Sequence, residues 1–163
     1  MLESAPQFLI ALEGSALGAA IRQSVWAYPT ANVGHILGLA LFAASVAIMD
    51  ARLLGAFAAA PPASIVRPAR RMAMAALLVM VATGSTLFIA EASHVAMNPV
   101  FQIKAGLIAL GLLNALLVAK ALDAALAATP PLAPLPARVR AAGAISLAIW
   151  ISVAACGRLI AYF

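Results

Sequence analysis

Long apolar stretches without charge are the feature that most constrains how this chain folds. No charged residue occurs between Arg71 and Glu91, and a second uncharged stretch runs from Ala105 to Ala119. Of the 163 residues 66% are hydrophobic and only 9% are charged, against roughly a quarter charged in ordinary globular domains. Because about 20 mostly apolar residues cross a bilayer core of roughly 30 Å, the chain has room for four or five crossings and little else, so it offers no soluble catalytic domain. The pattern predicts an integral membrane protein.

The spacing of breaks and charges divides this single membrane domain, residues 1–163, into four spanning helices. We expect these helices at about residues 32–53, 71–95, 99–124 and 141–162. Pro99 suits the first position of a helix, where the missing N–H would have no partner anyway. The prolines between Thr129 and Arg140 exclude a continuous helix there and predict the second long loop.

The segment ahead of the first span differs from the four apolar stretches. Residues 5–24 have apolar side chains at helical spacing, but Glu13 and Arg22 add charge. This pattern is typical of an amphipathic helix that lies along the membrane interface. The predicted fold class is therefore all-α, a membrane-embedded four-helix bundle with an N-terminal interfacial helix.

The basic residues predict the orientation of the bundle and exclude one class of partner. Seven of the ten Lys and Arg residues lie in or beside the loops that follow the first and third helices. The positive-inside tendency puts these loops in the cytoplasm and both chain ends on the outer side. The basic residues form no face with interleaved aromatics, so nucleic-acid binding is not expected, and the partner we expect is the lipid bilayer.

Several ionisable residues fall inside the predicted helices, near their outer ends. His35, His94, Lys104 and Arg158 share this side, and Glu91 lies one helical turn from His94. Intramembrane ionisable groups normally face the bundle interior and have a partner, and we find no comparable set in the inner half. The sequence thus predicts a shared polar site near the outer side, supported by Glu91, Asn32 and Asn98.

Simpler interpretations of the same residues stay open. Lys104 and Arg158 could each extend to the lipid headgroups, and Glu91 could form an ion pair with Lys104 between the second and third helices. His35 could hydrogen-bond to a neighbouring helix. The "GHILG" around it has glycines four residues apart that would permit close helix packing.

The two histidines also predict two kinds of cofactor. One is a b-type haem held between His35 and His94, with Arg158 or Lys104 pairing with a propionate. The other is copper, because "HVAM" puts His94 and Met97 three residues apart, and imidazole with thioether is a ligand set that Cu(I) accepts.

Several short blocks resemble small bacterial membrane-protein families of unknown function. The blocks are "YPTANVGHILG", "DARLLG", "TGSTLF", "NPVFQIK" and the ending "GRLIAYF", spread over residues 26–163. The four-helix topology with a histidine early in the first helix is also distantly similar to the copper-resistance D (CopD) type of membrane domain. The resemblance implies a bacterial inner membrane, so the outer side that the basic residues predict for both chain ends would be the periplasm.

The functional expectation is a small redox or metal-binding membrane protein, most simply a cytochrome with one b haem held by His35 and His94. The first alternative is a non-enzymatic accessory or assembly subunit with a structural polar cluster, acting with other membrane subunits or a second copy. The second alternative is a copper-binding membrane protein. We assign no catalytic residue.

Overall fold

The computed structural model describes residues 5–160 and 162, and this part of the chain is built from helices and short connections. The helices are α1 (Gln7–Glu13), α2 (Ala16–Gln23), α3 (Ala27–Leu54), α4 (Pro62–Ala90), α5 (Ala92–Met97), α6 (Pro99–Ala128) and α7 (Ala137–Leu159). Four of them, α3, α4, α6 and α7, are long and apolar enough to cross a membrane. The prediction of an all-α membrane bundle is confirmed.

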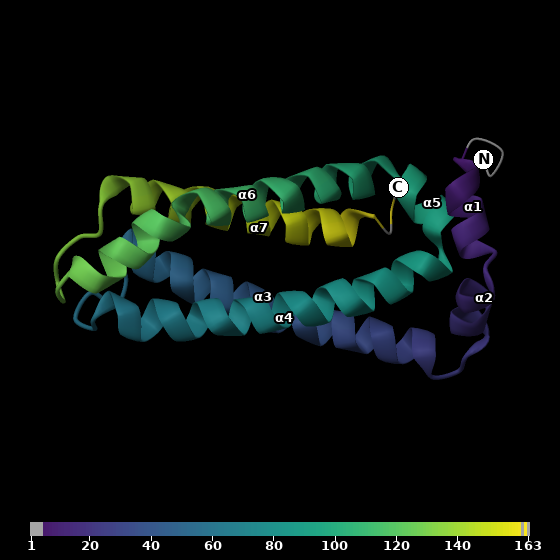
Figure 1. Cartoon of the computed structure of the whole chain (residues 1–163), viewed down its shortest axis with the longest axis horizontal. Helices are drawn as coiled ribbons and strands as arrows, with labels where there is room; N and C mark the ends of the chain where they lie inside the picture. Colours follow the sequence, from purple (N-terminus) through teal and green to yellow (C-terminus); the bar gives the residue numbers. More distant parts are fainter. Residues whose placement is uncertain (1–4, 161, 163) are drawn as a thin grey trace.

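The four long helices form two pairs that lie side by side. Extensive contacts join α3 to α4 and α6 to α7, and α3 also packs against α7, whereas α4 and α6 touch at few positions. Figure 1 shows the two pairs as an upper and a lower layer along the long axis. The bundle is therefore closed on the α3–α7 side and loosely joined on the α4–α6 side.

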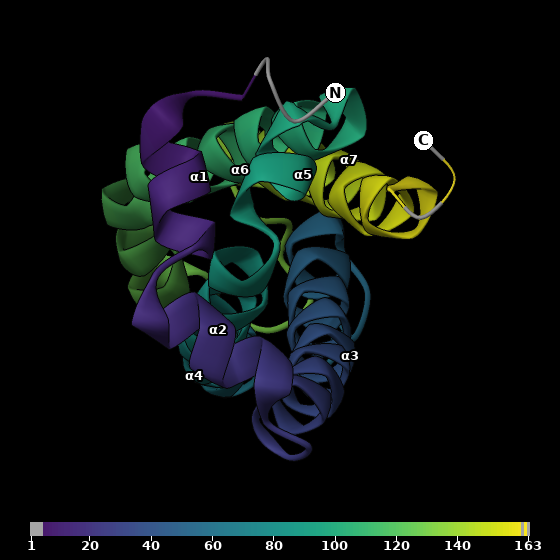
Figure 2. The same cartoon turned by 90° about the vertical axis from the view of Figure 1, so that its right-hand side faces the viewer.

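The two ends of the bundle are built differently. At one end α1, α2 and α5 lie across the long helices, as Figures 1 and 2 show, and we call this the capped end. At the other end the connections 55–61 and 129–136 join the long helices, and we call this the loop end. The two connections meet there, since the backbone N–H of Leu132 donates to the carbonyl of Ala58 at 2.8 Å.

The spanning helices are longer at the loop end than the sequence predicts. α4 begins at Pro62 instead of residue 71, α6 ends at residue 128 instead of 124, and α7 begins at residue 137 instead of 141. The prediction followed the uncharged stretches, but arginines are good helix formers and prolong a helix beyond its apolar part. Pro62 occupies the first turn of α4, where proline is favourable, while Pro68 lies inside the helix.

At the capped end two predicted helices are broken. The segment 5–24, predicted as one interfacial helix, forms α1 and α2, because the Ser15 hydroxyl accepts from the backbone N–H of Gly18 at 3.1 Å and caps a new helix. The predicted helix 71–95 ends at Ala90, where Glu91 leaves the helical conformation (φ −139°, ψ 36°) and α5 follows. α3 starts at Ala27, ahead of the predicted residue 32, and α7 ends at Leu159, before the predicted residue 162.

The apolar core concentrates toward the loop end. Its largest cluster of buried residues comprises Leu53, Val66, Val118, Leu122, Ala125, Leu126, Leu135, Val139 and Ala142. A second cluster lies nearer the middle around Phe42, whose ring meets that of Trp150 edge to face at 4.6 Å between centroids. These clusters join α3, α4, α6 and α7, so packing fixes the long helices mainly in that half.

Candidate functional site in the bundle interior

His35 lies half-buried on α3 and bonds to the neighbouring helix. Its Nδ1 is 3.0 Å from Oγ1 of Thr83 on α4. The Thr83 hydroxyl donates its proton to the carbonyl of Val79 at 2.7 Å. We therefore assign the imidazole proton to Nδ1, which donates to Thr83, and the lone pair to Nε2.

Glycines let α3 and α4 come close enough for this bond. A Cβ atom on Gly84 would lie 3.1 Å from Cε1 of His35, and one on Gly34 would lie 3.2 Å from Cγ2 of Thr83. On Gly38 it would lie 3.0 Å from Cγ of Met80. Small residues at a membrane-helix interface permit such close approach. The glycines around His35 thus pack against α4, as the simpler interpretation of "GHILG" expects.

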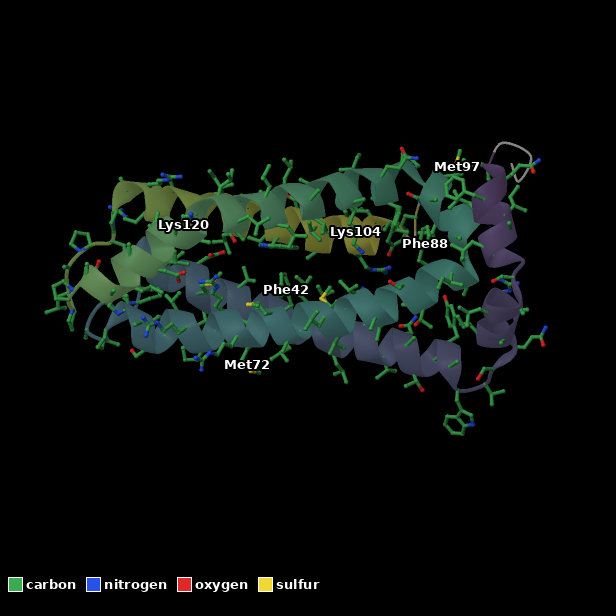
Figure 3. All side chains as sticks on the ribbon, viewed as in Figure 1. Phe42, Met72, Phe88, Met97, Lys104 and Lys120 are labelled. Atoms are coloured by element: carbon green, nitrogen blue, oxygen red, sulfur yellow. The ribbon has the colours of Figure 1, made fainter. Side chains whose placement is uncertain are left out.

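Lys104 brings a positive charge toward the same interior from α6. Figure 3 shows it on the side of α6 that faces the other helices. Its Nζ would lie 3.6 Å from a Cβ atom on Gly157 of α7, and it lies within electrostatic range of His35. Within residues 5–160 it has no hydrogen bond and no ion pair. The cluster of His35, Thr83 and Lys104 thus draws on three of the four long helices.

Glu91 does not pair with Lys104, in contrast to the ion pair considered from the sequence. Its Oε1 accepts a hydrogen bond from the Tyr28 hydroxyl at 3.2 Å, and its side chain is exposed. Among the described residues the ion pair that forms joins Arg70 and Asp123, at 2.9 Å. Glu91 therefore ties the start of α3 to the end of α4.

A separate set of hydrogen bonds fastens the helices of the capped end. The Glu13 carboxylate accepts from the backbone N–H of Ser93 at 2.8 Å and from its hydroxyl. These two bonds hold the pKa of Glu13 below its usual value, and the bond from the hydroxyl has the larger effect. The charge of Arg22 makes a smaller contribution to the pKa in the same direction. Nη1 of Arg22 donates to the carbonyls of Glu13 and Ala90, at 2.8 Å each. Polar side chains thus link α1 to α5 and α2 to α4.

His94 lies in this second set and not beside His35. It is exposed on α5, within electrostatic range of Glu13, and Met97 on the same helix is 43% exposed. α5 packs against α1, α4 and α6, and it lies apart from α3 in Figures 1 and 2. The structure does not bring the two imidazoles together. Within the described chain, no three His, Cys, Asp or Glu side chains form a group that could hold a metal ion.

The other predicted site residues have local roles. Asn98 is buried, and its Oδ1 accepts from the backbone N–H of Val100 at 2.9 Å, so it caps α6. Arg158 donates to the Tyr162 hydroxyl at 2.5 Å and stacks over that ring. Asn32 is exposed on α3. None of these three joins the interior cluster of His35 and Lys104.

Sequence reasoning missed the buried polar residues nearer the loop end. Asp50 is fully buried and Arg52 is 2% exposed, so the expectation that ionisable groups gather only in the outer half is wrong. Both residues lie near the end of the predicted helix 32–53, where charged residues commonly mark the boundary of a membrane span. Asp50 follows Phe42 and Val46 at helical spacing on the buried face of α3, and this periodicity could have placed it inside.

The chain was compared with protein families, curated proteins and solved structures. One family model matches residues 8–163, which is nearly the whole chain. The chain belongs to DUF6644, a family of unknown function. No curated protein and no solved structure matches it.

The matched residues include the four long helices and the short helices α2 and α5. They also include all of α1 except its first residue, Gln7. His35, Lys104 and Asp50 therefore all lie in the region that defines the family. The interior cluster has one imidazole, one hydroxyl and one ammonium group. Within this cluster, the bond from His35 to Thr83 joins α3 to α4.

Proposed function

We propose that this protein is a non-enzymatic membrane subunit whose interior polar cluster holds two of its long helices, α3 and α4, in register. The observation that carries the proposal is the hydrogen bond from His35 on α3 to Thr83 on α4. A polar side chain inside a membrane is costly unless it has a partner, and Thr83 supplies one for Nδ1. Interhelical hydrogen bonds of this kind contribute about 0.6 kcal/mol on average in membrane proteins, which suits a positioning role.

The polar bonds at the capped end support the same proposal. Glu13, Arg22 and Glu91 each satisfy a group on another helix, so these charged side chains have structural partners. In this account the short helices form a fixed layer against the bundle. The subunit would act beside another membrane protein or a second copy of the chain, in contact with the lipid bilayer.

A second candidate function is binding of haem or copper, and one observation favours it. Because His35 donates from Nδ1, its Nε2 keeps a lone pair, and metal-bound histidines commonly donate their other ring nitrogen in this way. The likeness to the copper-resistance D type of domain points in the same direction. His94 and Met97 lie on α5 and do not fit a shared ligand set with His35. A bound haem or copper would therefore have His35 as its ligand, with Lys104 nearby.

An absorption spectrum and a metal analysis separate the two candidates. The protein would be purified from cells supplied with a haem precursor and with copper. We expect no Soret band and no stoichiometric copper or iron, while His35→Ala lowers the thermal stability. A Soret band or bound copper that disappears in His35→Ala and remains in His94→Ala would overturn the structural role and support the second candidate.

We also propose that the capped end faces the periplasm of a bacterial inner membrane and the loop end faces the cytoplasm. The support is that seven of the ten basic residues lie at or near the loop end. In a Cys156→Ser background, Val25→Cys at the capped end should react with an impermeant thiol reagent in intact spheroplasts. Pro134→Cys at the loop end should react only after lysis. The reverse pattern would refute this orientation.

A further inference from the structure

A cavity of about 430 Å³ lies inside the bundle, between the four long helices. Its walls are mostly apolar and include Phe42, Val46, Leu77, Leu112 and Trp150. Figure 3 shows Phe42 in the space between the α3–α4 pair and the α6–α7 pair. The cavity is separate from the cluster of His35 and Lys104, because neither residue lines it.

The cavity opens on the side where α4 and α6 are loosely joined. Met74 on α4 and Leu116 on α6 both line it, and they are 58% and 74% exposed. These two residues lie within helices long enough to cross a membrane, so the opening faces the lipid. A molecule dissolved in the bilayer could therefore reach the interior without passing through water.

Asp50 supplies an unpaired carboxylate to this apolar cavity. The residue lines the cavity and is fully buried, and within the described chain neither carboxylate oxygen has a partner at full hydrogen-bond distance and angle. The Ser146 hydroxyl faces the carboxylate without completing such a bond. A buried carboxylate without a partner is strongly disfavoured, so such a group is expected to have a ligand or a proton. The position therefore differs from His35, whose Nδ1 has Thr83.

The other polar groups of the cavity also offer acceptors. Asn114 donates through Nδ2 to the carbonyl of Ala142 at 3.0 Å, which leaves its side-chain oxygen free to accept. The Ser146 hydroxyl lies beside Asp50 and can accept as well as donate. An acceptor-rich pocket is complementary to a ligand that carries several N–H donors.

Two arginines of this region, Arg70 and Arg52, bond to groups other than Asp50. Arg70 also lines the cavity, but its Nη1 is 2.9 Å from the Asp123 carboxylate. Arg52 lines a different hollow beside the connections of the loop end, and its Nη2 donates to the carbonyl of Ala60 at 3.0 Å. Neither forms an ion pair with Asp50, so the carboxylate keeps its capacity to bind a cation.

We propose that this cavity binds a lipophilic amine, whose ammonium group donates to Asp50 and whose apolar body fills the space between Phe42, Trp150 and the surrounding leucines. Charge complementarity selects an ammonium ion over a neutral or anionic molecule. The edge-to-face rings of Phe42 and Trp150 form an apolar wall for the body of the ligand, away from the ammonium group. This binding activity goes beyond the structural role proposed above and does not depend on it.

Isothermal titration calorimetry on the full-length protein in detergent tests the proposal with three probes of the same shape. The probes are 1-aminoadamantane, the uncharged 1-adamantanol and the anionic adamantane-1-carboxylate. We expect saturable binding of the amine, at least about tenfold tighter than that of the alcohol, because the charge-assisted bond to Asp50 is made only by the amine. Equal affinities of amine and alcohol would overturn the proposal, and this comparison needs no variant.

Variants then assign the binding to Asp50. Asp50→Asn keeps the shape and removes the charge, so it should lower the amine affinity at least about tenfold and leave the alcohol affinity unchanged. Glu91→Gln makes the same type of change outside the cavity and should alter neither affinity. Unchanged amine binding in Asp50→Asn would show that the amine binds elsewhere or only partitions into the detergent. If Asp50→Asn does not fold, Ala119→Phe, which partly fills the cavity, should weaken the binding of both probes.

Discussion

The loop end and the capped end of this bundle are held together by different forces. Near the loop end a cluster of buried Leu, Val and Ala residues joins the four long helices. At the capped end the short helices α1 and α2 are attached through Glu13 and Arg22, and Glu91 ties the end of α4 to the start of α3. Apolar packing is cooperative across the bundle, while single polar links can open one at a time. We expect global stability to reside near the loop end and local opening to occur at the capped end.

The largest effect is expected in the core near the loop end. Leu122 is 5% exposed in the largest apolar cluster, and Leu122→Ala should lower the free energy of unfolding by about 2–5 kcal/mol through the cavity it leaves. Leu117→Ala, at a position on the same helix that is 65% exposed, is the matched control and should cost much less. Denaturation in mixed micelles followed by circular dichroism measures both. Similar losses would mean that the cluster does not dominate stability.

A close helix contact in the same half gives the next largest effect. A Cβ atom on Gly143 of α7 would lie 3.0 Å from Cβ of Leu53 on α3, so Gly143→Val should destabilise the fold by about 1–3 kcal/mol through overpacking. Gly106→Val makes the same change on α6 where a Cβ atom would meet nothing within 4 Å. The difference between the two, measured by the same denaturation, isolates the contact. Equal effects would contradict a close contact between α3 and α7.

At the capped end we expect a smaller and local effect. Glu13→Gln removes the charged acceptor of the Ser93 hydrogen bonds. It should lower the free energy of local opening between α1 and α5 by about 1 kcal/mol, without changing the free energy of global unfolding. Hydrogen exchange of the α1 and α5 amides measures this, with Glu91→Gln as the control that leaves α1 unchanged. Loss of global stability in Glu13→Gln would contradict the division between the two ends.

The same link should depend on pH in a defined direction. The bonds from Ser93 hold the folded-state pKa of Glu13 below its ordinary value of 4.5. A carboxylate with a lowered pKa stabilises the folded form above its unfolded-state value, and this contribution is lost as the pH falls through the folded-state value. Protection of α1 should therefore be full above pH 4.5 and decline below it. Glu13→Gln should remove this dependence.

Much of the fold could be predicted from the sequence because the signals are local. The long apolar stretches mark the spans, and Pro99 marks the start of α6 after the Asn98 cap. The break at Glu91 could not be predicted in this way, because it occurs among contacts between segments far apart in the sequence, namely α5 with α1 and Glu91 with Tyr28 at the start of α3. The capping role of Ser15 in α2 follows the usual preference for serine at a helix start, which is a local signal that the sequence also carries.

The site was less predictable because it depends on which helix faces which. Sequence position put His35 and His94 on one side of the membrane, but the separation of α5 from α4 gives them different neighbours. The bond from His35 to Thr83 needs the close approach allowed by Gly34 and Gly84, which no single segment reveals. Asp50 was not among the predicted site residues because a charge near a helix end is usually exposed, whereas here side chains of the other long helices enclose it.

The smallest expected effect tests the central claim most directly, namely that His35 is a structural link between α3 and α4. The measurement is a double-mutant cycle of the unfolding free energy in micelles, with His35→Leu, Thr83→Val and the double variant. The account predicts that the sum of the two single losses in unfolding free energy exceeds the loss in the double variant by about 0.6 kcal/mol. This is the average coupling of such bonds in membrane proteins. Additive losses, with no coupling, would contradict a structural bond between these two side chains.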